Sequence, residues 1–383
     1  MVNDLKKTKN FGLPVFPWDT ILDITALAHS HPGGALDLTI GSPADSVAPG
    51  VQAALAQAAD SHGYPAAVGT GQLREAIADY MQQVRGTVPL TADQVLLTVG
   101  SKELVASLPF QLGLGSDHII GFPQVAYPTY EVGTLLAGAK PLRLPEDPSR
   151  WPTGEEAPAL VWLNSPGNPD GHTYDVADLR AIVRWAREND AVVAADECYA
   201  LLAWRGAPSG SAQGTPSLLD RRVCDADMRG LLAVHSLSKQ SNLAGYRAAW
   251  ICGDTALIAR LREVRKHAGL MVPGPVQAAM LVALGDKDTV SRQIAVYHER
   301  REMLLRATRA AGLSNDADSV AGLYLWLSAE DVTDGRELAR RLAQLGILVA
   351  PGDFYGEKGK KFVRMSLTAN SQTIRQVCAR LSE

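Results

Sequence analysis

Short apolar runs that alternate with helical patterns constrain the fold of this 383-residue chain more than any other feature. Each run is bounded by Gly, Pro, Asn, Asp or Ser, and helical segments such as 176–189 separate most of them. A strand that is apolar along its whole length has to be covered on both faces, as in a mostly parallel sheet between layers of helices. The sequence therefore predicts an α/β domain with strands at 95–99, 118–122, 159–163, 191–195, 231–235 and 248–252.

The pattern changes after about residue 276, where two long helical segments precede the next strand patterns. This α+β character predicts a second, smaller domain, with helices at 277–284, 289–311 and 334–345 and strands at 322–327 and 362–367. We expect three parts: an N-terminal arm with part of the small domain in residues 1–45, a large domain in 46–275 and a small C-terminal domain in 276–383.

Composition argues against several classes of function. The net charge is −4 with a pI near 6.1, which is unlike the clustered basic surface of nucleic-acid-binding proteins. No apolar stretch approaches the length of a membrane span, and no secretory leader is visible. The four cysteines form no CxxC pair and the histidines show no metal-ligand spacing. We expect a cytoplasmic protein with no metal, nucleic-acid or membrane partner.

The most informative motif is Ser-x-Ser-Lys, which ends at Lys239 directly after the apolar run 231–235. Ligands of open α/β sheets bind at this edge of the sheet. The hydroxyls of Ser236 and Ser238 and the guanidinium of Arg247 are donors suited to a phosphate dianion. A lysine placed there can form an imine with an aldehyde cofactor when burial and nearby cations lower its pKa. A lone lysine in a turn carries no such meaning, so the hypothesis depends on the motifs that accompany it.

A second motif, Asp-Glu-Cys-Tyr, begins at Asp196 directly after the run 191–195. A carboxylate at this place can hold the pyridine nitrogen of pyridoxal 5′-phosphate (PLP) protonated, which makes the ring an electron sink. Tyr199 can donate to the phenolate oxygen of the same cofactor. An aspartate at a strand end is otherwise most often a cap or turn residue.

Two further turns place polar groups at strand ends. Asn168 lies in Asn-Ser-Pro-Gly-Asn-Pro-Asp-Gly after the run 159–163, where Pro and Gly indicate a tight turn. Its amide can hydrogen-bond the same phenolate oxygen as the tyrosine. Ser101 and Lys102 follow the run 95–99 at a strand-to-helix junction. Backbone N–H groups and a hydroxyl at a helix N-terminus form a natural phosphate site.

The order NPxG, DExY and SxSK followed by arginine resembles the class I and II aminotransferases, which are fold type I PLP enzymes. The resemblance covers nearly the whole chain. It implies a large domain with a mostly parallel seven-stranded sheet, a smaller α+β domain, and PLP as the cofactor. By this resemblance Lys239 is the Schiff-base lysine and proton shuttle, Asp196 pairs with the pyridine nitrogen, and Asn168 and Tyr199 bind the phenolate oxygen. The other implied cofactor-binding residues, mostly at the phosphate, are Ser101, Lys102, Ser236, Ser238 and Arg247.

The same resemblance implies roles for four more residues. Tyr127 is similar to the aromatic residue that stacks on the pyridine ring, although its segment is two residues longer than the usual P-x-Y pattern. Arg364 resembles the arginine that forms a bidentate pair with the substrate α-carboxylate, and Gly41 resembles the glycine that lies against that carboxylate. Tyr64 matches a tyrosine that reaches the phosphate across a dimer interface, which implies a homodimer with shared active sites.

Within the family, the chain is most similar to succinyldiaminopimelate aminotransferases of the actinobacterial type. The segments that carry this likeness are 16–19, 62–66, 266–273 and 350–356. It implies ping-pong transfer from glutamate, which yields 2-oxoglutarate, to the keto acid N-succinyl-2-amino-6-oxopimelate in lysine and diaminopimelate biosynthesis. Trp18 in the N-terminal arm is a candidate wall of the substrate pocket, with bracing of the dimer as its alternative role.

Other functions stay open on the sequence. Another aminotransferase, acting on aspartate, an aromatic amino acid or N-acetylornithine, would share these motifs, and so would a PLP-dependent C–S lyase. A PLP-binding protein without turnover, such as the effector domain of a regulator, belongs to a different class, as does a dinucleotide-binding protein. The chain shows no appended DNA-binding segment and no GxGxxG motif that opens a helix, which weighs against both.

Overall fold

A seven-stranded sheet forms the centre of the larger part of the molecule. The protein is described here by a computed structural model of residues 11–383, so residues 1–10 of the expected arm lie outside the described part. The strands are β2 (Val95–Val99), β3 (Ile119–Pro123), β4 (Lys140–Leu144), β5 (Leu160–Asn164), β6 (Val192–Asp196), β7 (Leu231–Ser236) and β8 (Ala248–Gly253). Their order is β2-β8-β7-β6-β5-β3-β4, and β8 runs antiparallel to its neighbours while the other pairs are parallel.

Each of the six apolar runs forms a strand whose ends differ from the predicted ends by at most one residue. The predicted fold class, a mostly parallel sheet between helices, is therefore confirmed. The seventh strand, β4, was missing from the prediction. It lies at the edge of the sheet, and its first two residues, Lys140 and Pro141, are exposed, so it has no continuous apolar run.

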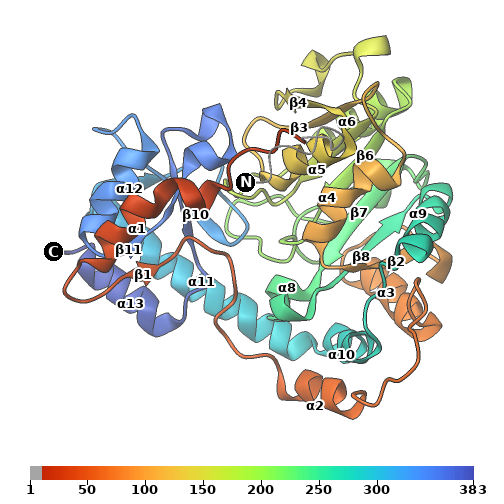
Figure 1. Ribbon diagram of the computed structural model, residues 1–383, viewed down its shortest axis with the longest axis horizontal. Helices are drawn as coiled ribbons and strands as arrows, with labels where there is room; N and C mark the ends of the chain where they lie inside the picture. The colour runs from red at the N-terminus through yellow and green to blue at the C-terminus, as the bar shows by residue number, and fades with distance from the viewer. Residues whose placement is uncertain (1–10) are drawn as a thin grey trace, which may run out of the picture.

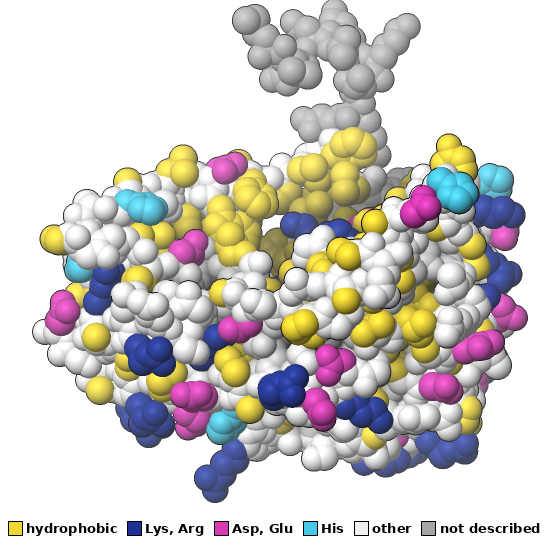
Figure 2. Space-filling view, turned by 90° about the horizontal axis from the view of Figure 1, so that it is seen from below, with side chains coloured by type: hydrophobic (Ala, Val, Ile, Leu, Met, Phe, Trp, Pro, Cys, Tyr) yellow, Lys and Arg dark blue, Asp and Glu magenta, His cyan; other side chains and the backbone are white. Residues whose placement is uncertain are grey.

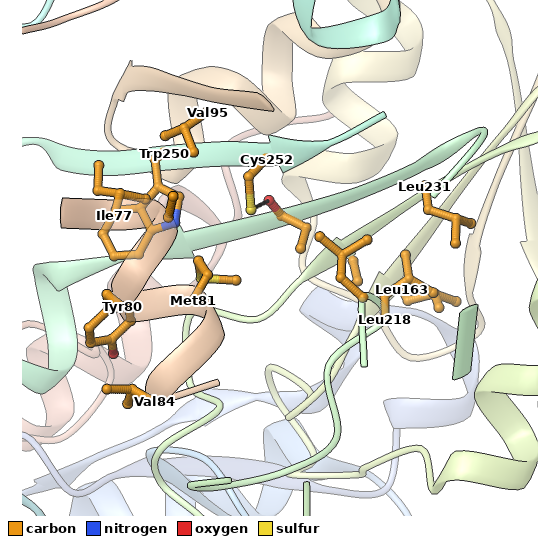
Figure 3. Close-up of a cluster of buried hydrophobic side chains, with 14 of the residues drawn as sticks. Ile77, Tyr80, Met81, Val84, Val95, Leu163, Leu218, Leu231, Trp250 and Cys252 are labelled. Carbon is orange, nitrogen blue, oxygen red and sulfur yellow. Dashed lines mark hydrogen bonds between the residues drawn. The ribbon is translucent and has the colours of Figure 1, made fainter. Parts of the chain in front are cut away.

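Helices cover both faces of this sheet, as the fully apolar strands require. Successive residues of one strand enter different buried clusters: Leu96 belongs to one, and Val95 and Leu97 belong to the other. The first cluster includes side chains of α4 (Ser101–Gln111), α5 (Thr129–Ala137) and α9 (Thr255–Ala268), and the second includes those of α3 (Gly71–Gln83), α6 (Val176–Glu188) and α10 (Gly274–Gly285). Figure 3 shows Ile77 and Met81 of α3 packed beside Trp250 of β8 in the second cluster.

The smaller part of the molecule contains an antiparallel sheet of order β12-β13-β10-β9. Its strands are β9 (Leu313–Asn315), β10 (Tyr324–Ala329), β12 (Ala350–Pro351) and β13 (Val363–Ser366), and its helices are α11 (Lys287–Ala310), α12 (Gly335–Gln344) and α13 (Ser371–Arg380). All the helices and strands predicted after residue 276 are present, with ends that differ by up to three residues.

Residues near the beginning of the chain join this smaller part. Strand β1 (Leu36–Asp37) pairs in parallel with β11 (Ile347–Leu348), and α1 (Leu22–His29) lies beside α12, on the left of Figure 1. We therefore propose the division into 1–45 with 276–383 as one unit and 46–275 as the other. Within residues 11–383, no helix is both long and apolar enough to cross a membrane.

Candidate active site

One cavity of about 500 Å³ brings together nearly all of the residues that the sequence singled out. It lies where β5, β6 and β7 end and where α4 begins. Figure 2 shows a hollow in the surface with hydrophobic side chains around it and Lys or Arg side chains inside it. The predicted residues that line the cavity are Trp18, Gly41, Ser101, Lys102, Tyr127, Asn168, Asp196, Tyr199, Ser236, Ser238, Lys239, Arg247 and Arg364. Tyr64 is the exception, because its side chain is 96% exposed and lies outside this lining.

Lys239 lies one turn beyond the end of β7, in the short helix α8 (Leu237–Gln240). The side chain of Ser236 caps this helix by accepting from the Ser238 backbone N–H. The lysine Nζ donates a hydrogen bond to the carbonyl of Gly41 across the cavity. Burial lowers the pKa of Lys239, and the positive charges of Arg364 and Arg247 lower it further. A larger share of this amine is therefore unprotonated, and so nucleophilic, than of an ordinary lysine.

Asp196 is held at the end of β6 by two hydrogen bonds. Its Oδ1 accepts from the backbone N–H of Cys198 at 3.2 Å, and its Oδ2 accepts from the hydroxyl of Tyr130 at 3.2 Å. Burial raises the pKa of Asp196, while both hydrogen bonds oppose that rise. Tyr130 is a supporting residue that the sequence did not reveal, and its ring stacks on Trp162 at 5.2 Å.

The guanidinium of Arg364 lies at the opposite wall, between two tyrosine rings. Its carbon Cζ is 4.1 Å from the ring centre of Tyr324 and 5.1 Å from that of Tyr355. Nη1 donates to Oδ1 of Asn168 at 2.6 Å, and Nη2 donates to the backbone carbonyl of Thr39. Two of the five N–H donors are thus used, which fixes the plane of the group and leaves the others for a ligand.

A cluster of donors forms the end of the cavity beside α4. Gly100 precedes this helix with a φ of 77°, and a Cβ there would overlap Nη2 of Arg247. The glycine therefore lets the guanidinium come close to the N-terminus of the helix, which favours anions. The hydroxyl of Ser236 donates to that of Ser238 at 2.8 Å. Arg247 has a φ of 57°, which is uncommon for a residue with a side chain.

The cavity rim on the side of the N-terminal segment is aromatic. The Trp18 ring lies 5.3 Å from that of Phe16 and 5.5 Å from that of Phe354. Arg336 of α12 links the segments that carry this rim. Its Nε donates to Asp353 at 2.7 Å, and its two terminal nitrogens donate to the carbonyl and the hydroxyl of Thr20, both at 2.9 Å. These contacts link segments that lie far apart in sequence, and no local motif predicts them.

The family model described as aminotransferase class I and II matches residues 34–381, nearly the whole chain. The chain belongs to this family. Class I and II aminotransferases depend on PLP, so the enzyme is a PLP-dependent aminotransferase, as the sequence predicted. The cavity suits this cofactor on structural grounds: a cluster of anion-binding donors at one end, a buried carboxylate at the other and a buried lysine that faces the space between them.

The curated relatives agree with this family. "Probable aminotransferase Rv1178" of Mycobacterium tuberculosis is 48% identical over 97% of this chain and 86% of its own length. "4-dedimethylamino-4-oxo-anhydrotetracycline transaminase OxyQ" of Streptomyces rimosus is 46% identical over 97% of this chain and 99% of its own length. An LL-diaminopimelate aminotransferase of Aquifex aeolicus is 28% identical over 90% of each chain.

Solved structures show the same fold. An aminotransferase from Mycobacterium tuberculosis superposes with a TM-score of 0.84 at 25% identity, covering 98% of both chains. The substrate-bound BacF structure from Bacillus subtilis gives a TM-score of 0.85 at 23% identity and covers 97% of this chain and 95% of its own. The second likeness supports the fold alone.

Proposed function

We propose that the enzyme transfers the amino group between N-succinyl-LL-2,6-diaminopimelate and 2-oxoglutarate. The observation that carries this proposal is the lining of the cavity, in which the buried guanidinium of Arg364 is accompanied by Phe16 and Trp18 of the aromatic rim and by the apolar side chain of Ile40. N-succinyl-LL-2,6-diaminopimelate and glutamate both carry an α-carboxylate, so a single arginine can bind either amino acid. The rim can accommodate the long succinylated chain of one substrate while leaving room for the short chain of glutamate.

Lys239 is the proposed attachment point of PLP and the group that moves the proton. When bound, PLP supplies an electron sink for the electron pair left on the substrate α-carbon. Displaced by the incoming amine, Lys239 would accept the proton from that carbon at Nζ and then donate it to the cofactor carbon that is bonded to the transferred nitrogen. The depressed pKa of Lys239 suits this exchange, because the lysine must alternate between the neutral and protonated forms near neutral pH.

The residues around Lys239 hold the cofactor in our proposal. Asp196 pairs with the pyridine nitrogen and Tyr127 stacks on the ring. Asn168 and Tyr199 donate to the phenolate oxygen, and the bond from Arg364 to Oδ1 of Asn168 turns the amide so that its nitrogen is the donor. The proposed phosphate ligands are Ser101, Lys102, Ser236, Ser238 and Arg247.

Arg364 and Gly41 are the proposed contacts of the substrate α-carboxylate. Tyr64 is proposed to reach the phosphate of a second copy across a homodimer interface, which would account for its exposed side chain. Sedimentation of the pure protein tests the dimer. If Tyr64→Phe leaves cofactor affinity unchanged in a dimeric protein, this role of Tyr64 is wrong.

The substrate proposal is tested by assaying the PLP-loaded enzyme with 2-oxoglutarate and a panel of amino donors. We expect N-succinyl-LL-2,6-diaminopimelate to give the highest kcat/KM, ahead of LL-diaminopimelate, N-acetylornithine, aspartate and phenylalanine. Trp18→Ala should reduce kcat/KM for the succinylated compound more than for glutamate. Faster turnover of aspartate or phenylalanine, with none of the succinylated compound, would contradict the substrate assignment and leave the aminotransferase intact.

A second candidate has its own support. OxyQ, which is named as a transaminase of an oxo-anhydrotetracycline, aligns with this chain over 99% of its own length at 46% identity. An apolar aromatic rim also suits a flat polycyclic ketone. Adding a tetracycline-type ketone as amino acceptor with glutamate as donor separates the two candidates, because a diaminopimelate enzyme should not aminate it.

A further inference from the structure

Tyr324 places a hydroxyl in the cavity that no motif of the sequence indicated. It is the first residue of β10, and its side chain is 3% exposed. Its ring lies under the guanidinium of Arg364, and its Oη lies 3.3 Å from the Oη of Tyr199. A Cβ on Gly41 would overlap this hydroxyl, so the oxygen is seated directly on the glycine backbone. The hydroxyl is therefore held firmly beside the tyrosine that we assign to the cofactor.

The two hydroxyls share a single hydrogen bond, and its direction decides what each can do. A tyrosine hydroxyl has one proton to donate and oxygen lone pairs that accept. If Tyr199 donates its proton to the cofactor phenolate oxygen, the proton between the two tyrosines has to come from Tyr324. Within residues 11–383, the Tyr324 hydroxyl makes no other hydrogen bond, so its proton is available for this purpose.

We propose that Tyr324 is a positioning residue that donates to Tyr199 and thereby fixes Tyr199 as the donor to the cofactor phenolate oxygen. This inference rests on the proposed function, in particular on the role of Tyr199. It adds a second link to the hydrogen-bond chain, from Tyr324 through Tyr199 to the cofactor. In such a chain each donor strengthens the next, because accepting a hydrogen bond makes a hydroxyl a better donor.

The surroundings of Tyr199 favour its neutral hydroxyl. Burial raises the pKa of Tyr199 well above its ordinary value, and Tyr324, Asp196 and Cys198 raise it further. Tyr199 therefore keeps its proton at working pH and remains a donor. The other titratable or charged side chains near the pair are Lys239, Arg364, Tyr127 and Tyr355.

The expected effect is on a protonation equilibrium of the bound cofactor. A donor at the phenolate oxygen stabilises negative charge there, so the oxygen holds less tightly the proton that it shares with the Lys239 nitrogen. Removing the Tyr324 hydroxyl weakens that donor and should raise the midpoint of the visible absorption titration. A single neutral hydrogen bond corresponds to about a threefold change in the proton dissociation constant, or about half a pH unit.

The experiment compares visible absorption against pH for the PLP-loaded wild type, Tyr324→Phe, Tyr199→Phe and the double variant. Tyr324→Phe should raise the midpoint by about half a unit, and Tyr199→Phe should raise it more. In the Tyr199→Phe background, Tyr324→Phe should have no further effect. Tyr355→Phe is the matched control, because its ring also packs against Arg364 while its buried hydroxyl has no partner among the described residues. It should leave the midpoint unchanged.

The inference is overturned if Tyr324→Phe leaves the midpoint where it was, or shifts it equally in both backgrounds. Thermal unfolding of each variant checks that the near-isosteric change has kept the fold. If Tyr324→Phe loses cofactor, Tyr324→Met in the same two backgrounds provides the comparison. Failure of the proposed function looks different: the wild type would then lack a pH-dependent visible band, or borohydride would fix PLP on a lysine other than Lys239.

Discussion

On the sheet side of the cavity, Asp196 ends a strand and Ser101 and Lys239 follow closely on strand ends, so their positions are set by the sheet itself. On the other side, hydrogen bonds join residues 316 and 325 positions apart, from Arg336 to Thr20 and from Arg364 to Thr39. The first side consists of strand ends in one continuous sheet. The second consists of loops and strand ends from both ends of the chain, joined mainly by arginines.

This difference separates the chemistry from the choice of substrate. The strand ends cannot move without disturbing a sheet whose residues are buried on both faces, which suits groups that must hold a cofactor in one geometry. The opposite wall belongs to the smaller part of the molecule, where Arg364 and Tyr324 lie in a separate antiparallel sheet, so it can vary without disturbing the large sheet. We therefore expect substitutions on the sheet side to abolish activity, and substitutions on the opposite side to weaken substrate binding or to change the preference among substrates.

The largest effect should come from Lys239→Ala. Loss of the group that carries the cofactor and the proton should reduce transamination by about a thousandfold or more, measured with glutamate as donor. Lys266→Ala, at an exposed lysine of α9, is the control and should be silent. Borohydride reduction followed by peptide mapping should find the cofactor on Lys239, and a label on another lysine would refute the assignment.

Asp196→Ala should come next, with a loss of about a hundredfold in kcat, because a neutral pyridine ring accepts electrons poorly. Asp196→Glu keeps the carboxylate and should retain much more activity. The measurement is kcat for both variants at saturating PLP, together with their unfolding temperatures. Small and equal losses in the two variants would mean that Asp196 only ends its strand.

Arg364→Lys tests the opposite wall, where we expect binding rather than chemistry to suffer. Lysine cannot supply the planar fork of donors, so KM for glutamate and for the long substrate should both rise by about tenfold. Arg341→Lys, at a half-exposed arginine of α12, is the control. An unchanged KM would mean that Arg364 does not bind the substrate α-carboxylate and that another residue of the cavity does.

The smallest effect should be the most selective. Arg336→Ala removes the hydrogen bonds to Thr20 and Asp353 that hold the aromatic rim around Trp18 in place. As a result, kcat/KM for the long substrate should fall about threefold. Glutamate should be affected less. Arg340→Ala, one turn along the same helix, removes a bond to Asp23 at 3.1 Å and serves as the matched control. Equal losses for both substrates would show that the rim does not distinguish them.

The sequence predicted the sheet side almost completely, because each of its residues belongs to a local motif placed by an apolar run. The fully apolar runs also predicted the ends of the strands that precede these motifs to within one residue. The edge strand β4 was not predicted, because it is partly exposed and has no continuous apolar run. Tyr130 was not predicted for another reason. Its hydroxyl donates a hydrogen bond to Asp196, 66 residues later in the sequence, and the local pattern does not distinguish it from a core tyrosine.

The opposite wall was predicted only where a resemblance supplied the residue, as for Arg364 and Trp18. Tyr324 begins the continuous apolar run Tyr-Leu-Trp-Leu of β10, so the sequence indicates a core tyrosine and does not distinguish its hydroxyl. Arg336 lies on the polar face of an amphipathic helix, where arginines are ordinary. The partner Thr20 of Arg336 lies in the N-terminal segment that leads to β1, which pairs with β11 more than 300 residues later, and local periodicity does not predict such long-range pairings.

That pairing of β1 with β11 also dictates an order of events while the chain is being made. The strands of the large sheet have all been synthesised once residue 253 is added, whereas β1 must wait for residues 347–348 before it finds its neighbour. At synthesis rates of about 5–20 residues per second, the 94 residues from 253 to 347 take on the order of 5–20 seconds after the last strand of the sheet is made. The half of the pocket that binds the cofactor can thus form first, and the half that selects the substrate is assembled last, by the two ends of the polypeptide.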